Sequence, residues 1–230
     1  MSRTFLFAGA SSAIALETGR LLQFKGDQVI GISRKDCDFP YDRFYRVEKY
    51  EDNLFPVIEQ QIDGLVYFPG TINLKPFSRL SPNDFQSDWS INALGAVSFV
   101  RVYLNNLKTS ANASIVFISS VAASMGLPFH SSISMAKGAI EGLTRALAAE
   151  LAPGIRVNAV APSLVSSPLG EKFINTPEKL EQMRERNPLR KVGEAVDVAN
   201  TITFLLGSES KWISGQIFAV DGGMSSIKNK

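Results

Sequence analysis

The chain has 230 residues, of which 45% are hydrophobic and 20% charged, the composition of an ordinary globular protein with room for one sizeable α/β domain. Its formal net charge of +2, with acidic and basic residues interspersed, gives no electrostatic reason to expect a nucleic acid or an anionic membrane as partner. No apolar run approaches the roughly 18 residues of a membrane span, and the N-terminus lacks the layout of a signal peptide. A single cysteine, Cys37, and a single histidine, His130, exclude an internal disulfide and the usual zinc sites, so the sequence predicts a cytoplasmic protein without a metal.

Short apolar runs alternate with longer amphipathic segments, an order typical of βαβ units around a parallel sheet. The first part of the chain predicts, in order, a strand over 4–8, a helix over 12–24, and strands over 28–33 and 62–68. A helix then begins at Ser81 and Pro82, with serine as N-cap and Asp84 in the first turn, and runs to about residue 107. The rest predicts a strand over 114–119, a helix over 132–151, a strand over 155–161, helices from 176 and over 194–206, and a strand over 216–220. With no repeat and no linker, these elements predict one domain over residues 1–230.

The segment between residues 34 and 62 departs from this alternation. It is polar and aromatic, and it contains no convincing amphipathic helix. It is also short for the strand and helix that a βαβ unit would place there. We therefore predict a shortened crossover in this part of the chain.

The first predicted strand is followed by a turn with features of a phosphate-binding loop, G-A-S-S-A-I-A over residues 9–15. Such turns use glycine for a tight bend and for close backbone approach to a pyrophosphate, which lies at the N-terminus of the next helix. We expect Gly9 to form the bend and Ser11 and Ser12 to offer hydroxyl and N–H donors. Ile14 is expected to contact the nucleotide. A plain strand-to-helix turn would have the same pattern, so this segment by itself leaves both interpretations open.

The second predicted strand ends in Ser33 and Arg34, with no acidic side chain at the strand end. An acid there would accept hydrogen bonds from the adenosine ribose and favour NAD, whereas a serine and an arginine suit the 2′-phosphate of NADP. Asp36 and Asp38 follow closely and weaken this argument, and an exposed arginine after a strand is the simpler alternative. We predict a preference for NADP(H), with NAD(H) the less favoured cofactor.

A set of motifs in a fixed order carries a resemblance to a known family. The set consists of D-G-L-V-Y-F-P-G over 63–70, Asn92 within a helix, Ser120 and Lys137 around the start of another helix, and the stretches over 156–162 and 215–223. In this order they resemble the short-chain dehydrogenase/reductase family over nearly the whole chain. The resemblance implies a doubly wound parallel sheet with a Rossmann-like α/β fold. It also implies an NAD(P)(H)-dependent oxidoreductase acting on a small or medium carbonyl or hydroxyl substrate.

The resemblance assigns roles to individual residues. Ser120 would hydrogen-bond the substrate oxygen, Lys137 would bind the nicotinamide ribose, and Asn92 would hold a water near that lysine. Two glycines of the family's phosphate-binding turn are replaced by Ala13 and Ala15, whose methyl groups would crowd the cofactor. The remaining implied cofactor contacts are Phe68, Pro69 and Gly70 after one strand, and Pro162, Leu164, Val165 and Ser167 after another.

One member of the family's catalytic set is missing. The family places a tyrosine one helical turn before the lysine, so that both side chains face the same site. That position holds Ile133, which cannot transfer a proton, and loss of a general acid typically costs about 10²–10⁴ in rate. The flanking Ser132 and Ser134 are interpreted as polar residues of the first helical turn.

Three interpretations of this replacement are open. His130, just upstream, would replace the phenol, because histidine commonly transfers protons near neutral pH, although a solvated loop histidine is the simpler assignment. Alternatively, Lys137 or Ser120 supports the reaction with a bound water as proton donor. In the third interpretation the site has lost its chemistry, and the protein is an NADP(H)-binding sensor or scaffold.

A homodimer or homotetramer is also predicted. Apolar residues on the two long predicted helices outnumber what one sheet face would cover, and in the family that the chain resembles such helices pair across a two-fold axis. The stretch over 169–190 lies where that family places its substrate lid, and it indicates no more than a small or medium, partly apolar ligand. The apolar residues in question are Phe99, Val100 and Tyr103 on the first helix and Ile140, Leu143 and Leu147 on the second.

Overall fold

The computed structural model describes residues 2–228 and contains a seven-stranded parallel sheet in the order β3-β2-β1-β4-β5-β6-β9. From β1 the chain adds β2 and β3 on one side and then returns to add β4 on the other, so the strand order reverses between β1 and β4. A separate parallel pair is formed by β7 (Val165–Ser166) and β8 (Gly193–Glu194). The strands of the large sheet are β1 (Thr4–Ala8), β2 (Gln28–Ser33), β3 (Arg43–Arg46), β4 (Gly64–Tyr67), β5 (Ala113–Ile118), β6 (Ile155–Pro162) and β9 (Ile217–Val220).

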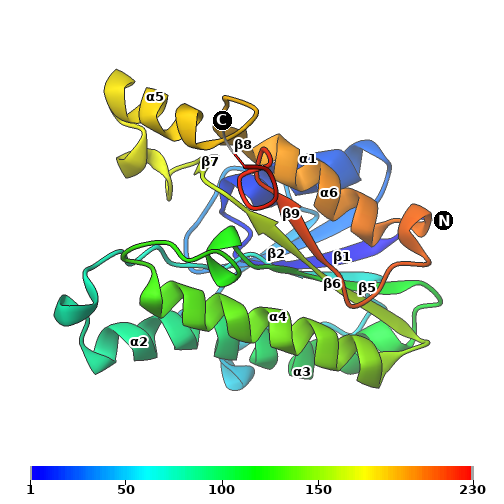
Figure 1. Ribbon diagram of the computed structural model, residues 1–230. Coiled ribbons are helices and arrows are strands. Elements are labelled where there is room, and N and C mark those ends of the chain that lie inside the picture. The colour runs from blue at the N-terminus through cyan, green and yellow to red at the C-terminus, as the bar shows by residue number, and fades with distance from the viewer. Residues whose placement is uncertain (1, 229–230) are drawn as a thin grey trace.

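Helices cover both faces of this sheet (Figure 1). On one face, α1 (Ala13–Phe24) and α6 (Ala195–Leu206) pack together over a buried cluster that contains Leu22 and Ile202. On the other face, α3 (Gly95–Lys108) and α4 (Ser131–Leu151) cover a second cluster, with α2 (Pro82–Trp89) against α4. The short helix α5 (Pro177–Arg186) extends away from the sheet (Figure 1). The doubly wound, Rossmann-like fold predicted from the resemblance is confirmed.

The chain from Ser81 to Lys108 contains a π-helical turn over Ser90–Leu94, which the sequence did not predict. In this turn the N–H of Gly95 donates to the carbonyl of Ser90, five residues back. The carbonyl of Ile91 instead accepts a hydrogen bond from the Tyr67 hydroxyl at 2.6 Å. Gly95 makes this possible, because a Cβ there would overlap the Tyr67 hydroxyl. Single π-turns inside helices are frequent at functional sites.

The predicted shortened crossover between residues 34 and 62 is confirmed. It contains the short strand β3, which the sequence did not predict, and one 3₁₀ turn over Asp52–Leu54, but no α-helix. Aromatic side chains fill the space instead: the ring of Phe55 lies with its centroid 5.5 Å from that of Phe99 on α3. The ring of Tyr50 lies 6.3 Å from that of Phe55.

The apolar residues from which a homo-oligomer was predicted are largely covered by the chain itself. They therefore do not supply the exposed surface on which that argument depended, and the oligomer itself stays a prediction. Leu143 and Leu147 are half-buried and pack against the cluster under α3 and α4. On these helices the exposed large apolar side chains are Leu94 and Met135. The fully covered residues are Phe99, Val100, Tyr103 and Ile140, all of them within the same cluster.

Candidate active site

The predicted site residues gather at one edge of the sheet. Because all seven strands are parallel, their carboxyl ends share that edge, on either side of the point where the strand order reverses. Ligands of open α/β sheets bind there. The edge holds Gly9 after β1, Ser33 at the end of β2, Gly70 after β4, Ser120 after β5 and Pro162 at the end of β6.

Lys137 lies on α4 and is only 6% exposed. Its ammonium donates a hydrogen bond to the carbonyl of Ile118, at the end of β5, with an Nζ–O distance of 2.7 Å. Burial lowers the pKa of Lys137 to about 8, and the charge of nearby Asp88 opposes this shift. The ammonium is therefore the main form at neutral pH, and it releases its proton more readily than an exposed lysine would.

Asn92 sits in the π-turn and is fully buried. Its Nδ2 donates to Thr71 Oγ1 and to the carbonyl of Asp88, both at 2.8 Å, while its Oδ1 has no hydrogen-bond partner in the part of the chain that the structure describes. A Cβ on Gly70 would lie 3.3 Å from that oxygen and 3.5 Å from Lys137 Nζ. An orphaned acceptor and an ammonium thus face the same small space, which glycine leaves open. This pair suits a hydroxyl group or a water, and it fits the ribose and water sites that the resemblance implies.

Ile133, where the resemblance implies a tyrosine, lies one turn before Lys137 on α4 and is 5% exposed. Its neighbours Ser132 and Ser134 lie in the first turn of α4, as predicted, and both hydroxyls also make hydrogen bonds to other elements. The fully buried Ser132 donates to Asp88 Oδ2 at 2.6 Å, and Ser134 donates to the carbonyl of Ala122 at 2.6 Å. Both hydroxyl protons are therefore committed within the protein, and neither serine replaces the phenol.

Ser120 follows β5 and is half-buried. Its hydroxyl oxygen accepts a hydrogen bond from the N–H of Ala122 at 3.2 Å, which begins a short 3₁₀ turn. The hydroxyl proton has no acceptor within the described part of the chain, residues 2–228. It can therefore be donated to a substrate oxygen, the role that the resemblance implies.

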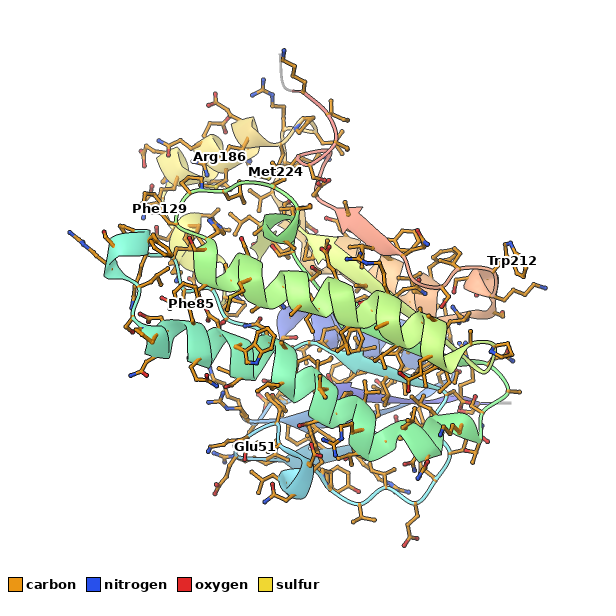
Figure 2. The ribbon with its side chains drawn as sticks, turned by 60° about the horizontal axis from the view of Figure 1, so that its bottom comes forward. Glu51, Phe85, Phe129, Arg186, Trp212 and Met224 are labelled. Atoms are coloured by element: carbon orange, nitrogen blue, oxygen red, sulfur yellow. The ribbon has the colours of Figure 1, made fainter. Side chains whose placement is uncertain are left out.

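His130 is the last residue before α4, and its side chain does not cap that helix. Its Nδ1 lies 2.7 Å from the carbonyl of Pro128, within the same loop. The preceding Phe129 has a φ of 68°, a strained conformation for a bulky residue, and its ring is exposed. In Figure 2, Phe129 lies at the same end of the molecule as Arg186 and Met224, opposite Trp212. The role of His130 as proton donor stays a prediction.

The turn after β1 requires glycine at one position. Gly9 has a φ of 71°, and a Cβ there would lie 2.8 Å from Cδ of Pro69, which follows β4. Ser12 caps α1, its oxygen accepting from the N–H of Ala15 at 3.3 Å, and its own N–H donates to the Gly9 carbonyl. The expectation that Ser12 offers a free N–H is therefore wrong. The half-buried Ile14 points partly into the core under α1.

The end of β2 is linked to the turn after β1 and to the crossover that follows it. Ser33 and Ser11 hydroxyls lie 2.8 Å apart, which links the strand end to the turn after β1. Burial raises the pKa of the Tyr50 hydroxyl, while hydrogen bonding with Ser33 and with the backbone of Arg34 and Gly9 opposes this. Tyr50, which the sequence did not single out, thus reaches the predicted adenosine site. Arg34 itself is exposed and lines a surface hollow with Arg46, Val47 and Glu48.

The loop after β6 is tied down by the small second sheet. Val165, in β7, is buried and pairs with Gly193 of β8. Ser167 donates to the Val165 carbonyl at 3.2 Å, and Leu164 is half-buried beside it. The implied nicotinamide-loop residues are therefore held at the sheet edge, after Pro162 ends β6.

Comparison with known proteins identifies the family. A family model described as Enoyl-(Acyl carrier protein) reductase matches residues 51–225. L-xylulose reductase of Bos taurus is 32% identical over 96% of this chain and 96% of that protein. The chain belongs to the short-chain dehydrogenase/reductase family. Its membership places it among NAD(P)-dependent oxidoreductases, as the sequence predicted.

Other short-chain dehydrogenase/reductases support this membership. The 3-oxoacyl-(acyl-carrier-protein) reductase of Thermotoga maritima is 31% identical over 95% of this chain and 96% of that protein. A tropinone reductase homolog of Arabidopsis thaliana is 34% identical over 76% of this chain, but the chain spans only 58% of that relative's length. A short chain dehydrogenase family protein from Francisella tularensis has the same fold, with a TM-score of 0.91 at 24% identity over 99% of this chain and 100% of that chain.

Three residues of this short-chain dehydrogenase/reductase site were not found from the sequence: Asp88, Thr71 and Tyr50. Asp88 precedes Asn92 by one helical turn, a spacing that could have drawn attention to it. Among residues 2–228, no group of three or more potential metal ligands comes together. No helix in that range is long and apolar enough to cross a membrane.

Proposed function

We propose that this chain binds NADP(H) and reduces a small or medium carbonyl substrate slowly, with Lys137 as the proton donor in place of the missing phenol. The observation that carries the proposal is the shared space beside Gly70. Both Asn92 Oδ1 and the Lys137 ammonium border this space. Among the described residues, the amide oxygen has no hydrogen-bond partner. Relatives named as reductases of a ketose and of an oxoacyl group support a carbonyl substrate.

The reaction requires a hydride at the carbonyl carbon and a proton at the carbonyl oxygen. Bound NADPH supplies the hydride. Ser120 donates a hydrogen bond that holds the carbonyl oxygen in place, and the Lys137 ammonium gives up a proton, directly or through one water at the Asn92 amide. A pKa of about 8 makes this lysine a better acid near neutral pH than an ordinary one. Solvent then returns a proton to the neutral amine.

Slow turnover follows from Ile133. Its buried side chain has no proton to transfer and places hydrocarbon one helical turn before Lys137, which disfavours an alkoxide that lacks a close donor. A lysine acting through a water is a less direct donor than a phenol. The second candidate function is that of an inactive NADP(H)-binding sensor. Ile133 favours it, and the other residues of the site are compatible with it.

NADP(H) rather than NAD(H) is supported by the end of β2. Ser33 ends the strand, the exposed Arg34 follows it, and no carboxylate stands at the strand end to accept ribose hydroxyls. Asp36, one of the two acids that weakened this argument, pairs with Arg46 at 2.9 Å. That pairing reduces its repulsion of a bound 2′-phosphate.

Calorimetric titration with NADPH and NADH, followed by an NADPH-oxidation assay on a panel of carbonyl compounds, tests the proposal. The donor is identified by two variants: Lys137→Arg keeps a positive charge but cannot release its proton, and His130→Ala removes the histidine. We expect activity to be lost in the first and kept in the second. The reverse result would assign the proton to His130, and cofactor binding without any turnover would establish the sensor.

We also propose a homodimer or homotetramer in the cytoplasm. The exposed Leu94 and Met135 on the helices of one sheet face support an interface there. Light scattering at micromolar concentration tests it, because a monomer would give about the chain mass of 25.1 kDa.

A further inference from the structure

A buried carboxylate lies behind the site. Asp88, on α2, is 2% exposed, and both of its oxygens accept hydroxyl hydrogen bonds. Thr71 donates to Oδ1 at 2.5 Å, and Ser132 donates to Oδ2 at 2.6 Å. Two hydroxyl donors satisfy a charged carboxylate well but do not neutralise it. None of the ion pairs found in residues 2–228 includes Asp88.

Lys137 presents the opposite case. It is a buried ammonium whose observed partner is a neutral carbonyl, that of Ile118, and among residues 2–228 no carboxylate lies within ion-pair distance of it. A buried charge without a counter-charge is costly. Hydrogen bonds lead from Asp88 towards Lys137: Asp88 accepts from Thr71, and Thr71 accepts from Asn92. The Oδ1 of Asn92 then faces the same space as Lys137 Nζ.

We propose that Asp88 is the buried counter-ion of Lys137, coupled to it through Thr71 and Asn92, and that it fixes both the charge of the lysine and the direction of the Asn92 amide. The direction follows from donor and acceptor counting. A Thr71 hydroxyl that donates to a carboxylate leaves only its oxygen free to accept, so Asn92 must turn its Nδ2 toward Thr71. The acceptor Oδ1 is then left toward Gly70 and Lys137.

Other titratable groups near this network have partners of their own. Asp84, one turn earlier on α2, pairs with Lys75 at 2.7 Å. Glu141, one turn after Lys137 on α4, accepts from Ser119 at 2.9 Å. His130 is bound within its own loop. Asp88 is the carboxylate whose charge acts on Lys137, opposing the effect of burial.

Asp88 is therefore a positioning residue, which acts on the chemistry through Lys137 and Asn92. This role deepens the proposed function, since Lys137 is the proton donor there. The electrostatic coupling itself is a property of the folded protein and exists with or without turnover. A test that reads the lysine directly thus separates failure of this inference from failure of the proposed function.

The test follows the Cε resonance of Lys137 by NMR in ¹³C-lysine-labelled protein between pH 6 and 11, assigned with Lys137→Arg. In Asp88→Asn we expect the titration midpoint of Lys137 to fall by about one pH unit or more, because an attractive charge is lost. The matched control is Glu141→Gln, which removes a carboxylate one turn away on the lysine's own helix and should leave the midpoint in place. A midpoint that moves no further in Asp88→Asn than in the control overturns the proposal.

Asp88→Asn could fail to fold because it leaves the ammonium without a counter-charge. In that case Asp88→Asn with Lys137→Met should recover a cooperative thermal transition, since both charges are then absent. If the double variant is as unfolded as the single one, the two groups are not counter-ions. If the lysine midpoint shifts as expected but no carbonyl is reduced, this inference stands and the proposed function fails.

Discussion

The contact between Tyr67 and Gly95 offers a quantitative test of how the π-turn around Asn92 is built. In Tyr67→Phe the carbonyl of Ile91 loses the hydroxyl that satisfies it at 2.6 Å, and leaving a buried carbonyl unpaired costs about 1–3 kcal/mol. In Gly95→Ala the new methyl overlaps that hydroxyl, so a fully buried ring must move. Overpacking costs about 1–3 kcal/mol, the displaced hydrogen bond is lost as well, and better helix propensity returns about 0.5–1 kcal/mol.

The double variant should be less destabilised than the sum of the single variants, by about 1 kcal/mol or more. The hydrogen bond can be lost only once, and without the hydroxyl the nearest contacts of the methyl are Tyr67 Cζ and Tyr50 Cβ, both at 3.1 Å. Urea denaturation followed by circular dichroism measures all three free energies of unfolding.

A matched control uses another fully buried tyrosine on the same face of the sheet. The Tyr103 hydroxyl donates to the carbonyl of Pro56 at 2.7 Å, away from the π-turn. Tyr103→Phe should therefore cost a similar amount and add to Gly95→Ala within about 0.5 kcal/mol. If Tyr67→Phe also adds to Gly95→Ala within that margin, the hydroxyl does not occupy the space beside Gly95 and the reasoning is refuted.

Four further outcomes are expected. Ile133→Tyr should raise carbonyl reduction by about 10²-fold or more in a steady-state assay, and a variant that binds NADPH but gains nothing would contradict the placement of Ile133 in the site. Arg34→Ala should weaken NADPH binding by about 10–100-fold in calorimetry and leave NADH binding unchanged, whereas Arg20→Ala serves as the control because Arg20 is an exposed arginine paired with Glu17 on α1. Ser120→Ala should lower the reduction rate while cofactor affinity stays constant. The unfolding free energy should rise by about 2–3 kcal/mol from pH 8 to 10 relative to Lys137→Met, because the folded lysine, with its pKa of about 8, releases its proton before the unfolded one does.

The regular elements were predictable because their signals are local. Ser81 and Asp84 form a capping box at the start of α2 as their spacing indicates, and β1 and β2 begin and end where the apolar runs do. The strand β3 was missed because it is short, lies at the sheet edge and carries arginines at both ends. Edge strands bury too little of their surface to show a clear hydrophobic pattern.

The parts of the site that sequence reasoning missed depend on contacts between distant residues. The π-turn exists because Tyr67, 24 residues before Ile91, supplies a hydroxyl to its carbonyl. Asp88 joins the site through Ser132, 44 residues later, whose own helical position suggested only a polar first turn. The resemblance located Lys137 and Asn92, but the network around them is formed by residues that the resemblance did not single out.

The composition of that network bears on the choice between an enzyme and a scaffold. A buried carboxylate and a buried ammonium that do not touch stabilise a fold less than apolar residues of the same size would. A protein that only binds a dinucleotide would need Lys137 for the ribose contact. It would not need a buried counter-ion that keeps this lysine protonated. Asp88, Ser132 and Thr71 are therefore better explained by a site in which the proton on Lys137 is used than by one in which it is merely retained. On the proposed function, Ile133 in place of a phenol leaves Lys137 as the acid of a slower reaction.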